Sequence, residues 1–114
     1  MPYLHVQTNA KPNEFEKSAF LDAAATAVAT HLGKNPAYVM AAIETELSLN
    51  FNSSELPAAF LELKVLGLDS SKNESLATVL SDIARIYLHV SEDRCFSRFV
   101  DTPAGHWGLG NQVF

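Results

Sequence analysis

The residue with the most direct chemical potential is the second in the chain. Aminopeptidases remove an initiating methionine that precedes a small residue, and removal of Met1 would leave Pro2 with a free secondary amine. A neutral amine accepts a proton, so this nitrogen could act as a general base if burial or a nearby positive charge lowered its pKa. Many unrelated proteins also begin with Met-Pro, so the dipeptide alone leaves a purely structural role open.

The other reactive side chains do not form a recognisable site. The histidines His5, His31, His89 and His106 lack the close spacing of metal ligands, so we predict surface or packing roles for them and no metal. Cys95 is the only cysteine, which excludes an intrachain disulfide and a paired-cysteine redox motif. We expect its thiol to behave as a small buried apolar group.

Composition narrows the classes of function. The 114 residues carry eight Lys and Arg against thirteen Asp and Glu, which gives a net charge of -5. Phosphate backbones are bound by clustered cations, and here the basic residues are scattered, so we predict no nucleic-acid partner. No stretch approaches the run of about 18 apolar residues that a membrane span needs, and the start lacks a signal-peptide pattern. We therefore expect a cytoplasmic protein without a membrane partner, which could be secreted only by a route that uses no signal peptide.

The hydrophobic pattern predicts four strands and two helices within one domain that spans residues 1–114. Alternating or continuous apolar runs predict strands, and apolar residues at helical spacing predict helices. The strands are expected at 3–8, 38–45, 59–66 and 95–101, and the helices at 13–32 and 71–88. We expect the strand at 38–45 to be largely buried, and Gly33 to cap the end of the first helix.

The order strand, helix, strand occurs twice, and each unit needs a parallel crossover between its strands. The fold class that we predict is α/β (α+β), with two βαβ units forming a four-stranded mixed sheet and both helices on one face. The other face then needs cover from elsewhere, most simply from further copies of the chain. A ferredoxin-like regulatory module has the same element order and stays an alternative.

Several short motifs stand at informative places in this framework. They are the Met1-Pro2 start, Gly33-Lys34, Val65-Leu66-Gly67, Asn73, Ser91-Glu92-Asp93-Arg94 and the C-terminal run from Trp107 to Phe114. Together they resemble the macrophage migration inhibitory factor family of the tautomerase superfamily over the whole length of the chain. The resemblance implies a homotrimer whose sheets form a central barrel, with active sites at subunit interfaces and Pro2 as the catalytic base.

The resemblance also implies an activity and further site residues. The expected reaction is keto-enol tautomerisation of a small keto or enol acid of the phenylpyruvate or dopachrome type, without a cofactor and with Pro2 as the acid-base group. Lys34 matches a catalytic lysine that would stabilise an enolate oxygen or a carboxylate. The implied substrate-binding residues are Lys34, Leu66 through its backbone N–H, Phe96, Arg98, Trp107, Leu109 and Phe114.

Some of these positions depart from the family pattern or have a simpler explanation. Phe96 stands where mammalian members have a tyrosine and Arg98 where they have an asparagine, so a hydroxyl is lost and a carboxylate-binding fork is gained. In this respect the chain is similar to D-dopachrome tautomerase. Arg98 could instead form a surface ion pair with Asp101 or Glu92. Lys34 could simply complement the dipole of the first helix, and the C-terminal aromatic residues could simply pack.

A second function fits the same fold. A cytokine-like module with vestigial catalysis would use its exposed surface to bind a protein receptor. The two hypotheses differ in their dependence on Pro2, because receptor binding would survive Pro2→Gly and catalysis would not.

Overall fold

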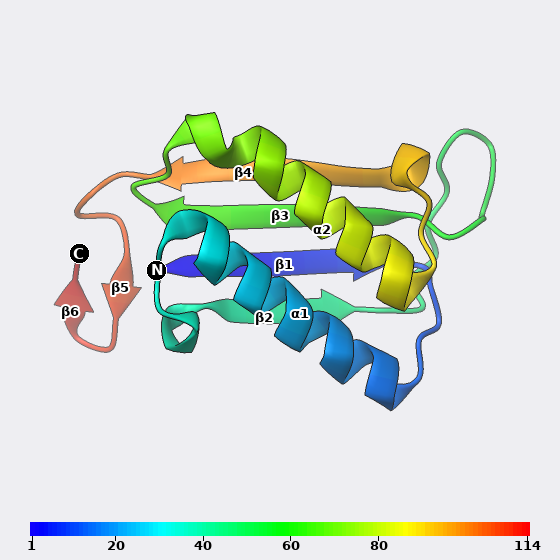
Figure 1. Ribbon diagram of the computed structural model, residues 1–114, viewed down its shortest axis with the longest axis horizontal. Coiled ribbons are helices and arrows are strands. Elements are labelled where there is room, and N and C mark those ends of the chain that lie inside the picture. Colours follow the sequence, from blue (N-terminus) through cyan, green and yellow to red (C-terminus); the bar gives the residue numbers. More distant parts are fainter.

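The computed structural model describes residues 1–114. Its main sheet contains β1 (Pro2–Thr8), β2 (Met40–Glu44), β3 (Ala59–Leu66) and β4 (Cys95–Thr102), in the order β2-β1-β3-β4. Helices α1 (Glu14–Leu32) and α2 (Asn73–Leu88) lie side by side over one face of this sheet (Figure 1). The C-terminal segment forms a separate hairpin from β5 (Gly108–Leu109) and β6 (Gln112–Val113). The predicted four-stranded mixed sheet with two helices on one face is confirmed.

Each βαβ unit pairs its two strands in parallel. Residues 3–7 of β1 lie beside 40–44 of β2, and all of β3 lies beside β4. The two units join through the antiparallel pair of β1 and β3, in which Pro2 lies opposite Val65. Because β1 and β2 are direct neighbours, no strand is inserted between them. This arrangement excludes the split βαβ topology of the ferredoxin-like alternative.

The hydrophobic core lies between the sheet and the two helices. Alternate residues of β1 and β3 point to this side, and the side chains of Leu4, Val6, Leu61 and Leu63 are fully buried. The period-2 alternation that predicts a strand at 59–66 matches β3 residue for residue. Cys95 is half-buried against this core, and its burial raises the pKa of the thiol above the ordinary value.

The two helices end in the same backbone conformation. Gly33 ends α1 with φ of 64°, and His89 ends α2 with φ of 58°, both in the left-handed region. The predicted cap at Gly33 is therefore confirmed. A histidine is less suited to this region than glycine, and the His89 Nε2 atom lies 3.2 Å from Glu16 Oε2 at the start of α1. This contact joins the end of one helix to the beginning of the other.

The prediction of a largely buried strand at 38–45 is wrong for the single chain. Asn35 and Pro36 begin a short 3-10 turn, in which Asn35 Oδ1 accepts a hydrogen bond from the Ala37 N–H at 2.9 Å. The strand β2 starts only at Met40, and none of its residues is buried. A continuous apolar run indicates burial only where both faces of the strand are covered, and β2 is an edge strand with one neighbour.

The sheet face away from the helices is open and carries both aromatic and charged side chains. Phe60 and Phe96 are exposed on it, and Glu62 lies between Lys64 and Arg98 with ion-pair distances of 3.1 and 2.8 Å. The hydrogen bonds from Arg98 and then Lys64 hold the pKa of the Glu62 carboxyl below its ordinary value. Neither α1 nor α2 combines the length and the apolar character that crossing a membrane requires.

Candidate active site

One end of the sheet brings together segments that are distant in the sequence. Figure 1 shows the N-terminus beside the C-terminal end of α1 and next to the β5–β6 hairpin. These segments surround a pocket of about 630 Å³ with mostly apolar walls. Its lining residues are Met1, Pro2, Tyr3, Ala37, Tyr38, Val39, Met40, Trp107, Gly108 and Leu109. Three of the residues predicted from the sequence, Pro2, Trp107 and Leu109, therefore meet at one pocket.

Pro2 is buried as the first residue of β1. Proline is tolerated at the first position of a strand because no ladder hydrogen bond from its nitrogen is lost there. The alternation of β1 turns Pro2 to the same side as the core residues Leu4 and Val6. The ring is thereby held by packing, while its nitrogen lies at the end of the strand, beside the pocket that Met1 and Pro2 both line.

The amino end of the chain lies in surroundings that disfavour positive charge. Burial, and after it the charge of Lys34, lower the pKa of the Met1 amine from the ordinary 8.0. Lys34 follows the Gly33 cap directly, and its N–H donates to Ala29 O at 2.9 Å, which turns the chain out of α1. The Lys34 side chain is exposed and does not line the pocket. It acts on the amine through its charge, as a cation near an amine is expected to do.

A backbone donor points to the same place. The N–H of Leu66, at the end of β3, donates to the carbonyl oxygen of Met1 at 3.3 Å. That oxygen is two covalent bonds from the nitrogen of Pro2. Removal of Met1 would therefore free a potential base and a hydrogen-bond donor for a carbonyl oxygen at the same time.

Phe114 is connected to the pocket through the backbone only. Its N–H donates to Trp107 O at 2.8 Å, and its carbonyl oxygen accepts from the Gly105 N–H at 2.6 Å. These bonds close the C-terminal turn that places Trp107 and Leu109 beside Pro2. The Phe114 ring is 41% exposed and does not line the pocket.

Phe96 and Arg98 lie far from Pro2 within one chain. Phe96 is paired with Phe60, whereas Pro2 lies opposite Val65, five positions farther along β3. At about 3.3 Å per residue, this separates the two sites by roughly 16 Å along the sheet. Arg98 Nη1 donates to Glu62 Oε2 at 2.8 Å, so neither of the acidic partners considered from the sequence is its partner.

Half of the residues in the wall of the pocket were not predicted from the sequence. Tyr3 of β1 and the run 37–40 also line it, and this run comprises the end of the connection between α1 and β2 and the first residue of β2. The local signal for this connection is the pair Asn35-Pro36, because Asn-Pro favours the start of a turn. A turn at that point delays the start of the predicted strand to Met40 and brings Tyr38 to the pocket.

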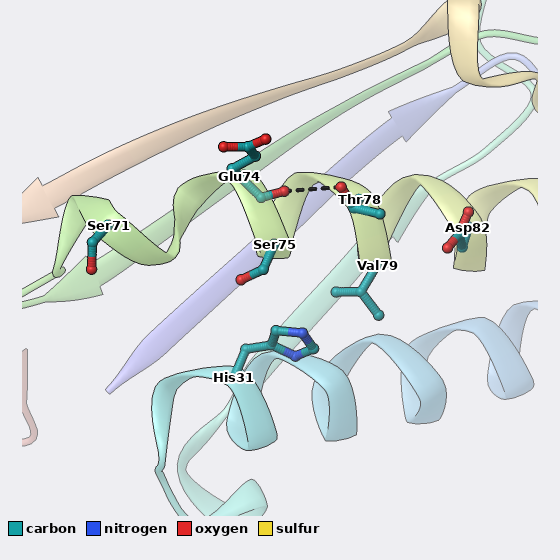
Figure 2. Close-up of a pocket in the computed structure, with 7 residues that line it drawn as sticks. All are labelled: His31, Ser71, Glu74, Ser75, Thr78, Val79 and Asp82. Carbon is teal, nitrogen blue, oxygen red and sulfur yellow. Dashed lines mark hydrogen bonds between the residues drawn. The ribbon is translucent and has the colours of Figure 1, made fainter.

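A different hollow lies on the helical layer, between α1 and α2, and Figure 2 shows its mostly polar lining. The lining residues are His31, Ser71, Glu74, Ser75, Thr78, Val79 and Asp82. The His31 Nδ1 atom lies 2.9 Å from Ala27 O, and the Thr78 hydroxyl donates to Glu74 O at 3.1 Å. These contacts satisfy backbone groups of the helices themselves. None of the site residues predicted from the sequence lies in this hollow.

Comparisons with known proteins extend over the whole chain. The family described as macrophage migration inhibitory factor (MIF) matches residues 1–114. A macrophage migration inhibitory factor homolog of Brugia malayi is 34% identical over 115 residues, which cover 100% of this chain and 99% of that protein.

Solved structures give the same result. The macrophage migration inhibitory factor of Toxoplasma gondii has a TM-score of 0.92 and 27% identity, over 98% of this chain and 99% of that one. The factor of Trichinella spiralis has a TM-score of 0.89 and 28% identity, again over 98% of this chain and 99% of that one. The full-length match to the family and the shared fold agree with the motifs of the sequence, and the chain belongs to the macrophage migration inhibitory factor family.

Proposed function

We propose that this protein is a keto-enol tautomerase that uses the nitrogen of Pro2 as its acid-base group after the loss of Met1. The observation that carries the proposal is the place of Pro2, buried at the end of β1 beside an apolar pocket and next to the Leu66 N–H. Burial and the charge of Lys34 lower the pKa of the amine that now ends the chain. The same two causes would act on Pro2 and keep its amine neutral.

The reaction moves one proton from carbon to oxygen within the substrate. The neutral Pro2 nitrogen takes a proton from the carbon next to the keto group, and the electron pair of that C–H bond forms a C=C bond. The π electrons of the carbonyl move to its oxygen, which becomes an enolate. The Leu66 N–H donates to this oxygen, and Lys34, which does not line the pocket, stabilises it through its charge alone. The protonated Pro2 then returns the proton to the oxygen, so the enol leaves and the neutral base is restored.

The proposal includes a homotrimer, because the site is incomplete within one chain. Phe96 lies toward the other end of the sheet and Arg98 near the middle of β4, and the outer edges of β2 and β4 have no neighbours. A second copy whose β4 begins beside the Pro2 pocket would complete the site. Arg98 donates one hydrogen bond to Glu62, and its remaining N–H groups fit the carboxylate of a keto acid.

Tautomerisation of phenylpyruvate by processed wild type and by Pro2→Gly tests the proposal. Glycine also permits removal of Met1, but it supplies a flexible primary amine in place of the packed ring. We expect the rate to fall roughly 10²-fold or more, since a positioned general base contributes roughly 10²–10⁴-fold. Intact mass must show that both proteins lack Met1. Equal rates in the two proteins would remove the catalytic role of Pro2.

A further inference from the structure

The chain buries one cation that the proposed reaction does not use. Arg94 directly precedes β4 and is only 8% exposed. None of the ion pairs of the protein involves it. A guanidinium group taken out of water needs other acceptors for its N–H groups, since a buried charge without partners is strongly disfavoured.

Backbone carbonyls of the segment 51–57, called the clamped loop below, supply these acceptors. Arg94 donates from Nε to Pro57 O at 3.1 Å and from Nη1 to Phe51 O at 2.9 Å. Its Nη2 atom donates to Ser54 O at 3.1 Å and to Leu56 O at 3.0 Å. The planar fork holds these directions fixed, and a lysine ammonium at one point could not reach all four oxygens.

The clamped loop has a backbone that needs such support. Asn52 and Ser53 both have φ of 54°, a region that residues with a side chain seldom adopt. Asn9 also binds the loop, at Glu55 O, but it makes no hydrogen bond to Phe51. Arg94 is therefore the side chain that fixes the end of the loop where Phe51 lies.

Phe51 connects the clamped loop to Phe96, which the proposed trimer would bring to the site of a neighbouring copy. Its ring centroid lies 5.3 Å from the Arg94 guanidinium carbon and 4.8 Å from the centroid of the Phe96 ring, which it meets edge-on at 84°. Phe60 stacks on Phe96 with centroids 6.5 Å apart. These three rings line a hollow of about 310 Å³, and Phe96 is 45% exposed.

We infer that Arg94 is a positioning residue, which fixes the clamped loop so that Phe51 holds the Phe96 ring in one orientation for the aromatic ring of the substrate. The inference rests on the proposed function for its substrate, but the orientation of Phe96 can be measured without any activity. Only an aryl keto acid has a ring to place on Phe96. Loss of the Arg94 hydrogen bonds to the clamped loop should therefore weaken the binding of an aryl keto acid and leave the binding of an alkyl keto acid unchanged.

Two variants test the two contacts separately, that of Arg94 with the clamped loop and that of Phe51 with Phe96. Arg94→Lys keeps the charge and removes most of the four hydrogen bonds, whereas Phe51→Leu keeps Arg94 and removes the ring against Phe96. Arg85→Lys is the matched control, because Arg85 is exposed on α2 and its single ion pair is with Asp82, at 3.9 Å. Far-ultraviolet circular dichroism and thermal unfolding establish which variants fold.

Steady-state kinetics with phenylpyruvate and an alkyl 2-keto acid separate positioning from general damage. In both variants we expect KM for phenylpyruvate to rise roughly threefold to tenfold, the value of one aromatic edge contact, with little change in kcat. KM for the alkyl acid and all constants of Arg85→Lys should stay as in wild type. If Arg94→Lys does not fold, Phe51→Leu decides, and an unchanged ratio of the two KM values in Phe51→Leu overturns the inference.

Fluorine NMR with a ring-fluorinated phenylalanine at position 96 gives a readout that needs no catalysis. We expect one resonance well away from the free amino acid in wild type and in Arg85→Lys, and a shift toward the free position in folded Arg94→Lys. A resonance in Arg94→Lys identical to that of wild type overturns the inference. If wild type has no activity with either acid, the proposed function fails, and this spectrum still decides whether Arg94 positions Phe96.

Discussion

The two ends of the sheet are held together by different kinds of contact. At the Pro2 end, mostly apolar residues from three segments form the walls, and a hydrogen bond beside Pro2 joins two backbone groups, Leu66 N–H and Met1 O. At the Phe96 end, the side chains of Arg94 and Asn9 fix a loop through a set of hydrogen bonds.

The difference agrees with the roles that we propose for the two ends. A base that must stay neutral needs surroundings of low polarity, so acidic groups near Pro2 would raise its pKa and favour the protonated form. The aromatic residue Phe96 has no charge to control and needs only a fixed orientation. Buried polar side chains are therefore compatible with the Phe96 end, whereas acidic ones at the Pro2 end would favour the protonated form of Pro2.

The largest effect is expected from retention of Met1. With Met1 in place the nitrogen of Pro2 belongs to an amide and has no basicity, and the Leu66 N–H is occupied by the Met1 carbonyl. Protein made with methionine aminopeptidase inhibited should lose activity roughly 10²–10⁴-fold, the contribution of a general base. Treatment of the same sample with the aminopeptidase should restore the rate in proportion to the processed fraction seen by intact mass. Activity independent of that fraction would contradict the role of Pro2.

The next largest effect is expected from Lys34→Gln. The Lys34 charge lowers the pKa of the chain's amine, so its removal should raise that pKa and move the acid limb of kcat/KM to higher pH. Loss of one stabilising group for the enolate should lower kcat toward the small end of roughly 10²–10³-fold. The measurement is a pH profile of kcat/KM, with Lys11→Gln, an exposed lysine without an ion pair, as control. An acid limb at the same pH in Lys34→Gln and wild type would show that Lys34 does not act on the base.

At the Phe96 end, Arg98→Gln should raise KM for keto acids roughly tenfold, the loss expected for one hydrogen bond to a carboxylate, and change kcat less. The proposed trimer places this side chain at the site of a neighbouring copy. Mixed trimers of Arg98→Gln and Pro2→Gly subunits should therefore regain active sites that neither variant has alone. Activity in the mixture no higher than the average of the two parent proteins would speak against a shared site.

The smallest effect is expected from Glu62→Gln. The pKa of Glu62 is lowered in the folded chain, so its contribution to stability is present above the ordinary pKa of 4.5 and is lost as the pH falls through the lowered value. We expect Glu62→Gln to reduce stability at neutral pH by less than about 1 kcal/mol, as for other exposed pairs. Thermal unfolding at pH 7 and below pH 4 measures this, with Glu55→Gln as control. A difference between Glu62→Gln and wild type that is the same at both pH values would contradict it.

Most of the fold could be predicted from the local hydrophobic pattern of the sequence. The alternation of 59–66 and the helical spacing ending at Gly33 placed their elements within two residues of the observed bounds. Such patterns work because a strand or a helix repeats one geometry, and each repeat meets the same side of the core. The burial of β2 could not be predicted in this way, because it depends on which strands become neighbours in the sheet.

The candidate site divides in the same way. Pro2, Lys34 and the C-terminal aromatic run were identified from motifs, since the chemistry of a terminal amine and a cation belongs to the residues themselves. Tyr38 was missed as a pocket residue and Glu62 as the partner of Arg98. The first depends on a turn between elements, and the second on the register of two strands that are distant in the sequence.

By itself, then, the sequence determined the order and type of the four main strands and two helices, the family and the candidate base, but not the β5–β6 hairpin. Only the tertiary structure decided that Phe96 and Arg98 lie away from Pro2 and that Arg94 is buried against carbonyl oxygens. Periodicity and capping act between near neighbours in the chain, whereas strand register and loop packing bring together residues whose separation in the sequence carries no signal.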